Sequence, residues 1–103
     1  MDGLTMTIDK TNPPVRRYIL NGRISSAESN ALQHELEEAM RAGSVNFVLN
    51  MRQISYLCSA GIRVLLMMYK RTKEQKGSFY VESPSENVIN VLGMTALDEM
   101  LLK

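Results

Sequence analysis

The sequence contains few of the residues that form disulfides or metal sites. It contains one cysteine, one histidine and no tryptophan, and its charges nearly cancel at a formal net charge of +1. One cysteine cannot form an internal disulfide, and one cysteine with one histidine is too few for a zinc site. The near-neutral charge provides no field that would hold nucleic acid or an anionic membrane. We therefore expect no metal site, no direct contact with nucleic acid and no membrane contact.

Long hydrophobic runs are also missing. No stretch reaches the roughly 18 apolar residues that cross a bilayer, and the start, Met1-Asp-Gly-Leu-Thr5, lacks the basic and apolar regions of a signal peptide. Together with the single cysteine, this predicts a cytoplasmic protein. The length of 103 residues suits one domain, 1–103, with a single core.

The usual catalytic motifs are absent as well. His34 falls on the polar side of a predicted helix, and no Gly-x-Ser-x-Gly elbow supplies a serine nucleophile. No P-loop motif is present for a nucleotide. The acidic pairs Glu37-Glu38 and Asp98-Glu99 are adjacent in sequence, so their side chains diverge on a helix. We predict that the chain is not an enzyme.

What the sequence does contain is a regular alternation of strand and helix patterns. Apolar periodicity predicts strands at 4–8 and 15–21, a helix at 26–42, a strand at 45–49, a helix from 59 to about 75, a strand at 78–81, and two C-terminal helices that follow Ser83 and Thr95. The order is β-β-α-β-α-β-α-α. The first two strands predict an antiparallel hairpin, and the helical crossovers predict parallel strands, so we expect a four-stranded mixed sheet with helices packed on it.

Local signals refine these boundaries. Ser25 and Glu28 form a capping-box pattern at the start of the first helix. Gly22 is expected to end the second strand, and the segment 51–57 is expected to be a loop. Ser83 is expected to cap the next-to-last helix, with the proline that follows it at the first helical position.

The central stretch, 54–68, is expected to run from a loop into a helix. Its apolar residues Ile62, Leu65, Leu66 and Tyr69 have helical spacing and predict the buried face. Ser59 stands just before them. It is either an ordinary N-cap, which stabilises a helix by about 1 kcal/mol, or a modified residue. A phosphate there would meet unpaired backbone N–H groups and add a charge of about −2.

The residues of this stretch carry a family resemblance. Tyr56-Leu-Cys-Ser-Ala-Gly-Ile-Arg-Val-Leu-Leu66 resembles the signature of STAS-domain proteins, specifically the bacterial anti-sigma factor antagonists, which usually read aromatic-x-Asp-Ser-(Ser/Thr/Ala)-Gly-Leu-(Gly/Arg)-Val-Leu. The segments 20–25, 47–50, 83–88 and 92–94 resemble further parts of the family pattern, so the match covers nearly the whole chain. The resemblance implies the STAS fold, a small mixed sheet with helices packed against it.

The resemblance also implies a function. In that family the unmodified protein binds an anti-sigma factor, a serine kinase with its own ATP, and this binding releases a sigma factor. The kinase then phosphorylates a serine that maps onto Ser59, and the complex dissociates. A metal-dependent serine phosphatase of the PPM type reverses the modification. No cofactor is implied for this chain, and whether it is a monomer or a weak dimer stays open.

The predicted partner contacts surround that serine. They are Ser25, Cys58, Ser59, Ala60, Gly61, Ile62, Arg63 and Met67. The family usually has Asp at the positions of Ser25 and Cys58, so this corner is less negative than in its relatives. Cys58 is expected to be a small, partly buried residue, and a redox role for a low-pKa thiol is the weaker alternative. Met67 is either an exposed apolar contact or packs under a neighbouring loop.

Two other functions fit the resemblance. The chain could be a STAS scaffold that is not phosphorylated, as a subunit of a signalling complex or of a transport ATPase. It could also sense a small ligand. Phosphorylation of Ser59 by a kinase would distinguish the anti-sigma factor antagonist from the scaffold. A co-purified ligand would indicate the sensor.

Overall fold

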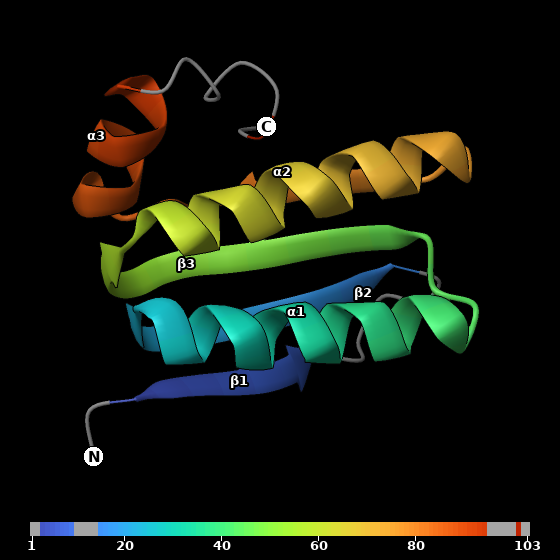
Figure 1. Cartoon of the computed structure of the whole chain (residues 1–103), viewed down its shortest axis with the longest axis horizontal. Coiled ribbons are helices and arrows are strands. Elements are labelled where there is room, and N and C mark those ends of the chain that lie inside the picture. Colours follow the sequence, from blue (N-terminus) through green and yellow to red (C-terminus); the bar gives the residue numbers. More distant parts are fainter. Residues whose placement is uncertain (1–2, 10–14, 95–100, 102–103) are drawn as a thin grey trace.

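The computed structural model describes residues 3–9, 15–94 and 101, and it contains one four-stranded sheet (Figure 1). The strands lie in the order β1 (Leu4–Asp9), β2 (Arg16–Ile24), β3 (Asn46–Leu57) and β4 (Ser78–Glu82). β1 pairs with β2 in antiparallel fashion, while β3 runs parallel to both of its neighbours. The predicted mixed sheet with an N-terminal hairpin is confirmed.

Three helices complete the described fold. α1 (Ser26–Arg41) and α2 (Ser59–Glu74) lie side by side over one face of the sheet and run in the same direction (Figure 1). α3 (Glu86–Met94) packs against β3 beyond the end of β4. The order β-β-α-β-α-β-α agrees with the prediction. The last predicted helix, from Thr95, lies outside the described residues except for Leu101, which is helical and fully buried.

The core lies between the sheet and α1 and α2. In β2, in β4 and in β3 as far as Met51, alternate residues are buried under the helices, as the period of two in a strand requires. The buried side chains are Tyr18, Leu20 and Ile24 of β2, Phe47, Leu49, Met51, Ile54 and Leu57 of β3, Phe79 and Val81 of β4, Leu32, Leu36 and Ala39 of α1, and Val64, Leu65 and Met68 of α2, joined by Val88 and Leu92 of α3 and by Leu101. His34 is exposed on α1, as predicted.

β3 is much longer than the sequence indicated, and the loop predicted at 51–57 is wrong. β3 has one more residue than β2 at each of two register shifts, after Ile19 and after Gly22. The buried positions of β3 therefore change from a spacing of two (47, 49, 51) to a spacing of three (51, 54, 57). These β-bulges remove the alternation by which a strand is recognised in a sequence.

Gly22 does not end its strand either, because β2 continues to Ile24. Its φ is +123°, a conformation that favours glycine, and a Cβ there would lie 2.1 Å from the backbone oxygen of Gly3. The glycine allows β1 and β2 to approach closely beside a bulge, where any side chain would collide with the neighbouring backbone.

The start of α3 lies two residues later than predicted. Ser85, and not Ser83, is the N-cap: its Oγ accepts a hydrogen bond from the N–H of Val88 at 3.2 Å and donates one to the carbonyl of Ile54 at 2.6 Å. Ser83 has a positive φ of 47°, outside the helix. A cap that also bonds to β3 fixes α3 to the strand, and sequence pattern alone does not show that second bond.

Both long helices end in the same hydrogen-bonded turn. After α1, Gly43 has a φ of +110° and its N–H bonds to Met40, while the next N–H bonds to Ala39. After α2, Lys76 takes the corresponding left-handed position with a φ of +62°. The Gly77 N–H then reaches the carbonyl of Thr72 at 2.7 Å. These are Schellman motifs, and at α2 a residue with a side chain occupies the position that glycine favours.

Replacing Lys76 by glycine should therefore stabilise the protein. We expect Lys76→Gly to raise the free energy of unfolding by about 1 kcal/mol, because glycine adopts the left-handed conformation without a steric cost. Urea unfolding at equilibrium measures the change. Gln75→Gly is the matched control, since Gln75 has a φ of −92°, and it should give no gain. Equal stabilisation by both variants would contradict this explanation.

Candidate functional site

The candidate site is the corner where β2 and β3 end together. Ile24 pairs with Leu57 at the ends of these strands, and the N–H of Cys58 donates to the carbonyl of Ile24 at 2.9 Å. α1 and α2 each begin within two residues of this pair. Two helix N-termini, with their unpaired N–H groups and positive dipole ends, therefore lie next to each other.

Ser25 occupies the α1 side of the corner. Its backbone N–H donates to Oε1 of Glu28 at 3.2 Å, and its hydroxyl donates to the same carboxylate, so the predicted capping box is present. These bonds from the Ser25 hydroxyl, and then from backbone N–H groups, hold the pKa of Glu28 below its usual range. The Ser25 side chain is thus engaged with its own helix.

On the α2 side, the expectation that Ser59 is an N-cap is wrong. Cys58 is the N-cap, with extended backbone angles, and its carbonyl accepts the first helical hydrogen bond from Ile62 at 3.0 Å. Ser59 is the first residue inside the helix and is exposed. The shift arises because the last sheet hydrogen bond already fixes Cys58 in extended conformation. The Ser59 hydroxyl is left available to solvent.

Cys58 is half-buried between the two helices. Its Sγ lies 3.5 Å from the Oγ of Ser29, a buried α1 residue whose hydroxyl also donates to the carbonyl of Ser25 at 2.8 Å. Burial raises the pKa of the Cys58 thiol. The hydrogen bond with Ser29 and the N–H groups of Gly61 and Ala60 lower this pKa, and their combined effect exceeds that of burial, so the net shift is downward. Sequence reasoning missed Ser29, although its spacing from Leu32 and Leu36 places it on the buried face of α1.

Gly61 is buried directly under the corner. A Cβ added there would lie 2.6 Å from Cδ1 of Leu57, 2.9 Å from Cγ2 of Ile24 and 3.3 Å from Oγ of Ser29. The first turn of α2 can therefore approach the strand ends only if this residue has no side chain. Gly61 supports the site from inside and presents no surface of its own.

The buried face of α2 is rotated by one residue from the prediction. Gly61, Val64, Leu65, Met68 and Thr72 are buried, whereas Ile62, Leu66 and Tyr69 are only partly buried. The segment 64–69 is apolar throughout, so hydrophobicity alone does not fix the phase of the helix. The close packing of Gly61 determines which face of α2 meets the sheet, and a hydrophobic pattern does not identify such a glycine.

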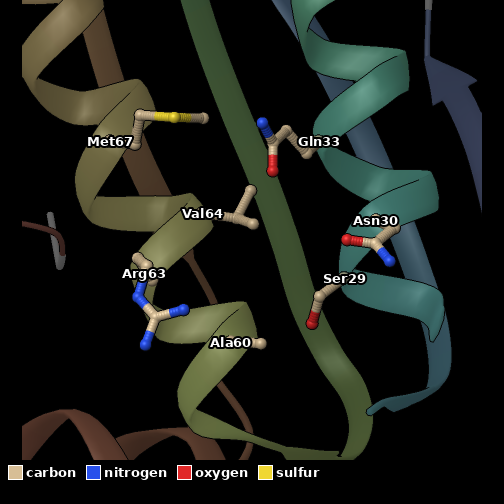
Figure 2. Close-up of a pocket in the computed structure, with 7 residues that line it drawn as sticks. All are labelled: Ser29, Asn30, Gln33, Ala60, Arg63, Val64 and Met67. Atoms are coloured by element: carbon tan, nitrogen blue, oxygen red, sulfur yellow. The ribbon is translucent and has the colours of Figure 1, made fainter. Parts of the chain in front are cut away.

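A groove runs between the first halves of α1 and α2, and one of its lining residues is Ala60, which follows Ser59 in the chain (Figure 2). Its volume is about 260 Å³, and it is lined by Ser29, Asn30, Gln33, Ala60, Arg63, Val64 and Met67. Met67 is half-buried on the wall of this groove and packs against the core, so it matches neither of the two expectations for it. Arg63 is exposed. The three α1 residues in this wall were not predicted, since sequence does not show which helices are neighbours.

An aromatic side chain completes the surroundings of the corner. Tyr56, 41% exposed at the end of β3, stacks under the guanidinium of Arg23 with 4.6 Å between the guanidinium carbon and the ring centroid. In the described part of the chain, no cluster of three metal-ligating side chains occurs, and none of the described helices has the length and apolar character of a membrane span. The corner offers hydroxyl, thiol, amide and cationic groups, together with the Glu28 carboxylate that Ser25 binds.

Comparison with known proteins identifies the family. The family model of the STAS domain matches residues 7–103. The chain belongs to the STAS domain family. A curated relative is BtrV of Bordetella bronchiseptica, whose name assigns it provisionally to the anti-sigma factor antagonists. It is 33% identical over 58 residues, which are 56% of this chain and 50% of BtrV, so the match spans about half of that protein.

Solved structures of other proteins share the fold. The anti-sigma factor antagonist SpoIIAA in its unphosphorylated form has a TM-score of 0.83 at 15% identity, with 95% of this chain and 86% of that chain covered. The Bacillus cell fate determinant SpoIIAA in its phosphorylated form has a TM-score of 0.77 at 14% identity, with 95% and 89% covered. At such identities these structures establish the STAS architecture.

The tight packing at Gly61 gives a stability prediction. Gly61→Ala should lower the free energy of unfolding by about 1–3 kcal/mol, because Leu57 and Ile24 are buried and have little room to move. Gly93→Ala is the control: it is also a helical glycine, but a Cβ there meets nothing within 4 Å. This control should be neutral or stabilising by up to about 1 kcal/mol. Thermal and urea unfolding measure both, and an equally stable Gly61→Ala would refute the packing argument.

The hydrogen bond to Ser29 gives a pH prediction. Because the folded state lowers the pKa of Cys58, iodoacetamide should react half-maximally at a lower pH with the native protein than with the urea-unfolded chain. Ser29→Ala should move the native midpoint upward, since it removes a hydroxyl that can turn from the Ser25 carbonyl to donate to the thiolate. Ser26→Ala, an exposed serine on the same helix, should leave the midpoint unchanged. Identical midpoints for native and unfolded protein would contradict the lowered pKa.

Proposed function

We propose that this chain is an anti-sigma factor antagonist that acts by partner switching in the cytoplasm. Unmodified, it binds an anti-sigma factor serine kinase and so releases a sigma factor. Phosphorylation of Ser59 by that kinase ends the binding, and a PPM-type serine phosphatase restores it. The kinase binds the ATP, and this chain needs no cofactor of its own.

The observation that carries the proposal is the place of Ser59. Its hydroxyl is exposed at the first position of α2, on the corner formed by two strand ends and two helix starts. It stands where the family signature has its phosphorylated serine. The names of BtrV and SpoIIAA, and the existence of SpoIIAA in unphosphorylated and phosphorylated forms, support the same function.

Charge explains how one phosphate can act as a switch. At the N-terminus of α2 a phosphate of about −2 charge is favourable for the helix itself, because it lies at the positive end of the helix dipole. The chain should therefore stay folded when it is modified. In a packed contact with another protein, the same charge costs desolvation and repels acidic groups, so binding is lost while the fold is kept.

Two residues of the corner set this chain apart from the family pattern. Cys58 and Ser25 stand where carboxylates are usual. Both side chains already have hydrogen-bond partners in this chain: the thiol contacts Ser29, and the serine binds Glu28. The surface around Ser59 is correspondingly less negative. We propose that these residues determine which kinase and phosphatase act on the chain, while the acceptor hydroxyl is retained.

Phosphorylation by a candidate anti-sigma factor kinase tests the proposal. We expect incubation with the kinase and ATP to add one phosphate by intact-protein mass spectrometry, and Ser59→Ala to abolish it. Ser26→Ala is a matched control, because Ser26 is the exposed first residue of the neighbouring helix, and it should still be modified. The phosphorylated protein should bind the kinase at least about tenfold more weakly than the unmodified protein.

The opposite results have clear meanings. A complex that forms normally but transfers no phosphate would overturn the switch and favour a STAS scaffold that is not phosphorylated. A phosphate that remains in Ser59→Ala would place the modification elsewhere on the chain.

A further inference from the structure

The groove between α1 and α2 carries a positive charge that no residue in the described ranges 3–9, 15–94 and 101 pairs with. Among the described residues that line it, Arg63 is the one cation and none is acidic. Within the described part of the chain, Arg63 makes no ion pair or hydrogen bond. Figure 2 shows its guanidinium on the α2 side of the groove, with the amides of Asn30 and Gln33 on the α1 side.

The far half of the same helix pair differs. There the guanidinium of Arg71 on α2 bonds the carboxylate of Glu37 on α1 at 2.8 Å, and the Gln33 amide donates to that carboxylate at 3.3 Å. In this half, charged side chains of the two helices form an ion pair. In the other half, Arg63 has no ion-pair partner among the described residues. The half with Arg63 also lies at the N-terminal ends of both helices, where their dipoles add to the positive potential (Figure 1).

We propose that this groove receives a carboxylate side chain of the partner protein on Arg63. The chemistry of the lining fits an aspartate or glutamate: a guanidinium and amide groups for the carboxylate, and Ala60, Val64 and Met67 for its aliphatic part. This inference rests on the proposed function, because it concerns the partner of that same site. It extends the partner surface from α2 onto α1.

The groove also connects the carboxylate to the switch. Ser59 and Arg63 are four residues apart on α2, so their side chains lie on the same face, one turn from each other. A phosphate on Ser59 is an anion within reach of the same guanidinium. Phosphorylation therefore gives Arg63 an internal partner, and the carboxylate of the other protein loses its contact.

Binding of the candidate kinase by calorimetry, with ADP so that no phosphate is transferred, tests this inference. Arg63→Gln should weaken binding about tenfold and reduce its dependence on NaCl concentration. Asn30→Asp should weaken it similarly, because it places a carboxylate in the groove. Lys70→Gln, which removes an exposed charge of α2 outside the groove, should remain within about twofold. Asn30→Ala should weaken binding less than Asn30→Asp, because it removes an amide without adding a negative charge. Arg63→Lys should retain part of the affinity.

A double-perturbation cycle tests the connection to the switch. Phosphorylation of Ser59 should weaken binding by a smaller factor in Arg63→Gln than in the unaltered chain, since the contact it disrupts is already gone. If phosphorylation weakened binding by the same factor in both proteins, the phosphate and the partner carboxylate would not compete for Arg63.

The remaining outcomes distinguish the proposals. Full affinity of Arg63→Gln, with Ser59 still phosphorylated, would overturn the groove proposal and leave the proposed function intact. No binding by the unaltered chain would overturn both. A small anion seen in native mass spectra and lost in Arg63→Gln, or a dimer lost in that variant, would assign the groove to a ligand or a second copy, and would also overturn the proposal.

Discussion

The structure depends on the parallel pairing of β2 with β3. This pairing covers the whole of β2 and ends with the hydrogen bond from Cys58 to Ile24. Because both strands end at the same level, the helices that follow them begin at the same level and pack side by side. The exposed serine, the half-buried thiol that precedes it and the groove between the two helices all result from this one alignment. Gly61 permits it, since a side chain there would hold α2 away from the strand ends.

Sequence patterns predicted the elements well where one physical signal dominated. The hairpin, the capping box at Ser25 and the exposed His34 all follow from local periodicity or turn chemistry. The prediction was wrong where tertiary packing decided. The bulges of β3 removed the alternation that identifies a strand, so its second half was not predicted. The segment 64–69 of α2 is apolar throughout, so its pattern did not indicate which face is buried. Ser85 caps α3 and also bonds to β3, a contact that no local pattern contains.

The same distinction applies to the candidate site. Residues 58–63 stand together in the sequence, so a motif can identify them. The α1 half, formed by Ser29, Asn30 and Gln33, lies about thirty residues earlier and joins the site only through helix packing. Whether Arg63 carries an uncompensated charge is likewise a property of the fold, because it depends on which α1 residues face it. A motif therefore identifies the acceptor serine, while the fold determines what surrounds it.

The division of the corner between two segments also bears on folding. A protein that touches both helix starts contacts residues that are neighbours in the native state and far apart in the unfolded chain. Such a partner binds the native state alone, so its binding shifts the folding equilibrium toward that state in proportion to its free concentration. The complex would thus protect this small domain from unfolding, and release of the partner would return the domain to its intrinsic stability.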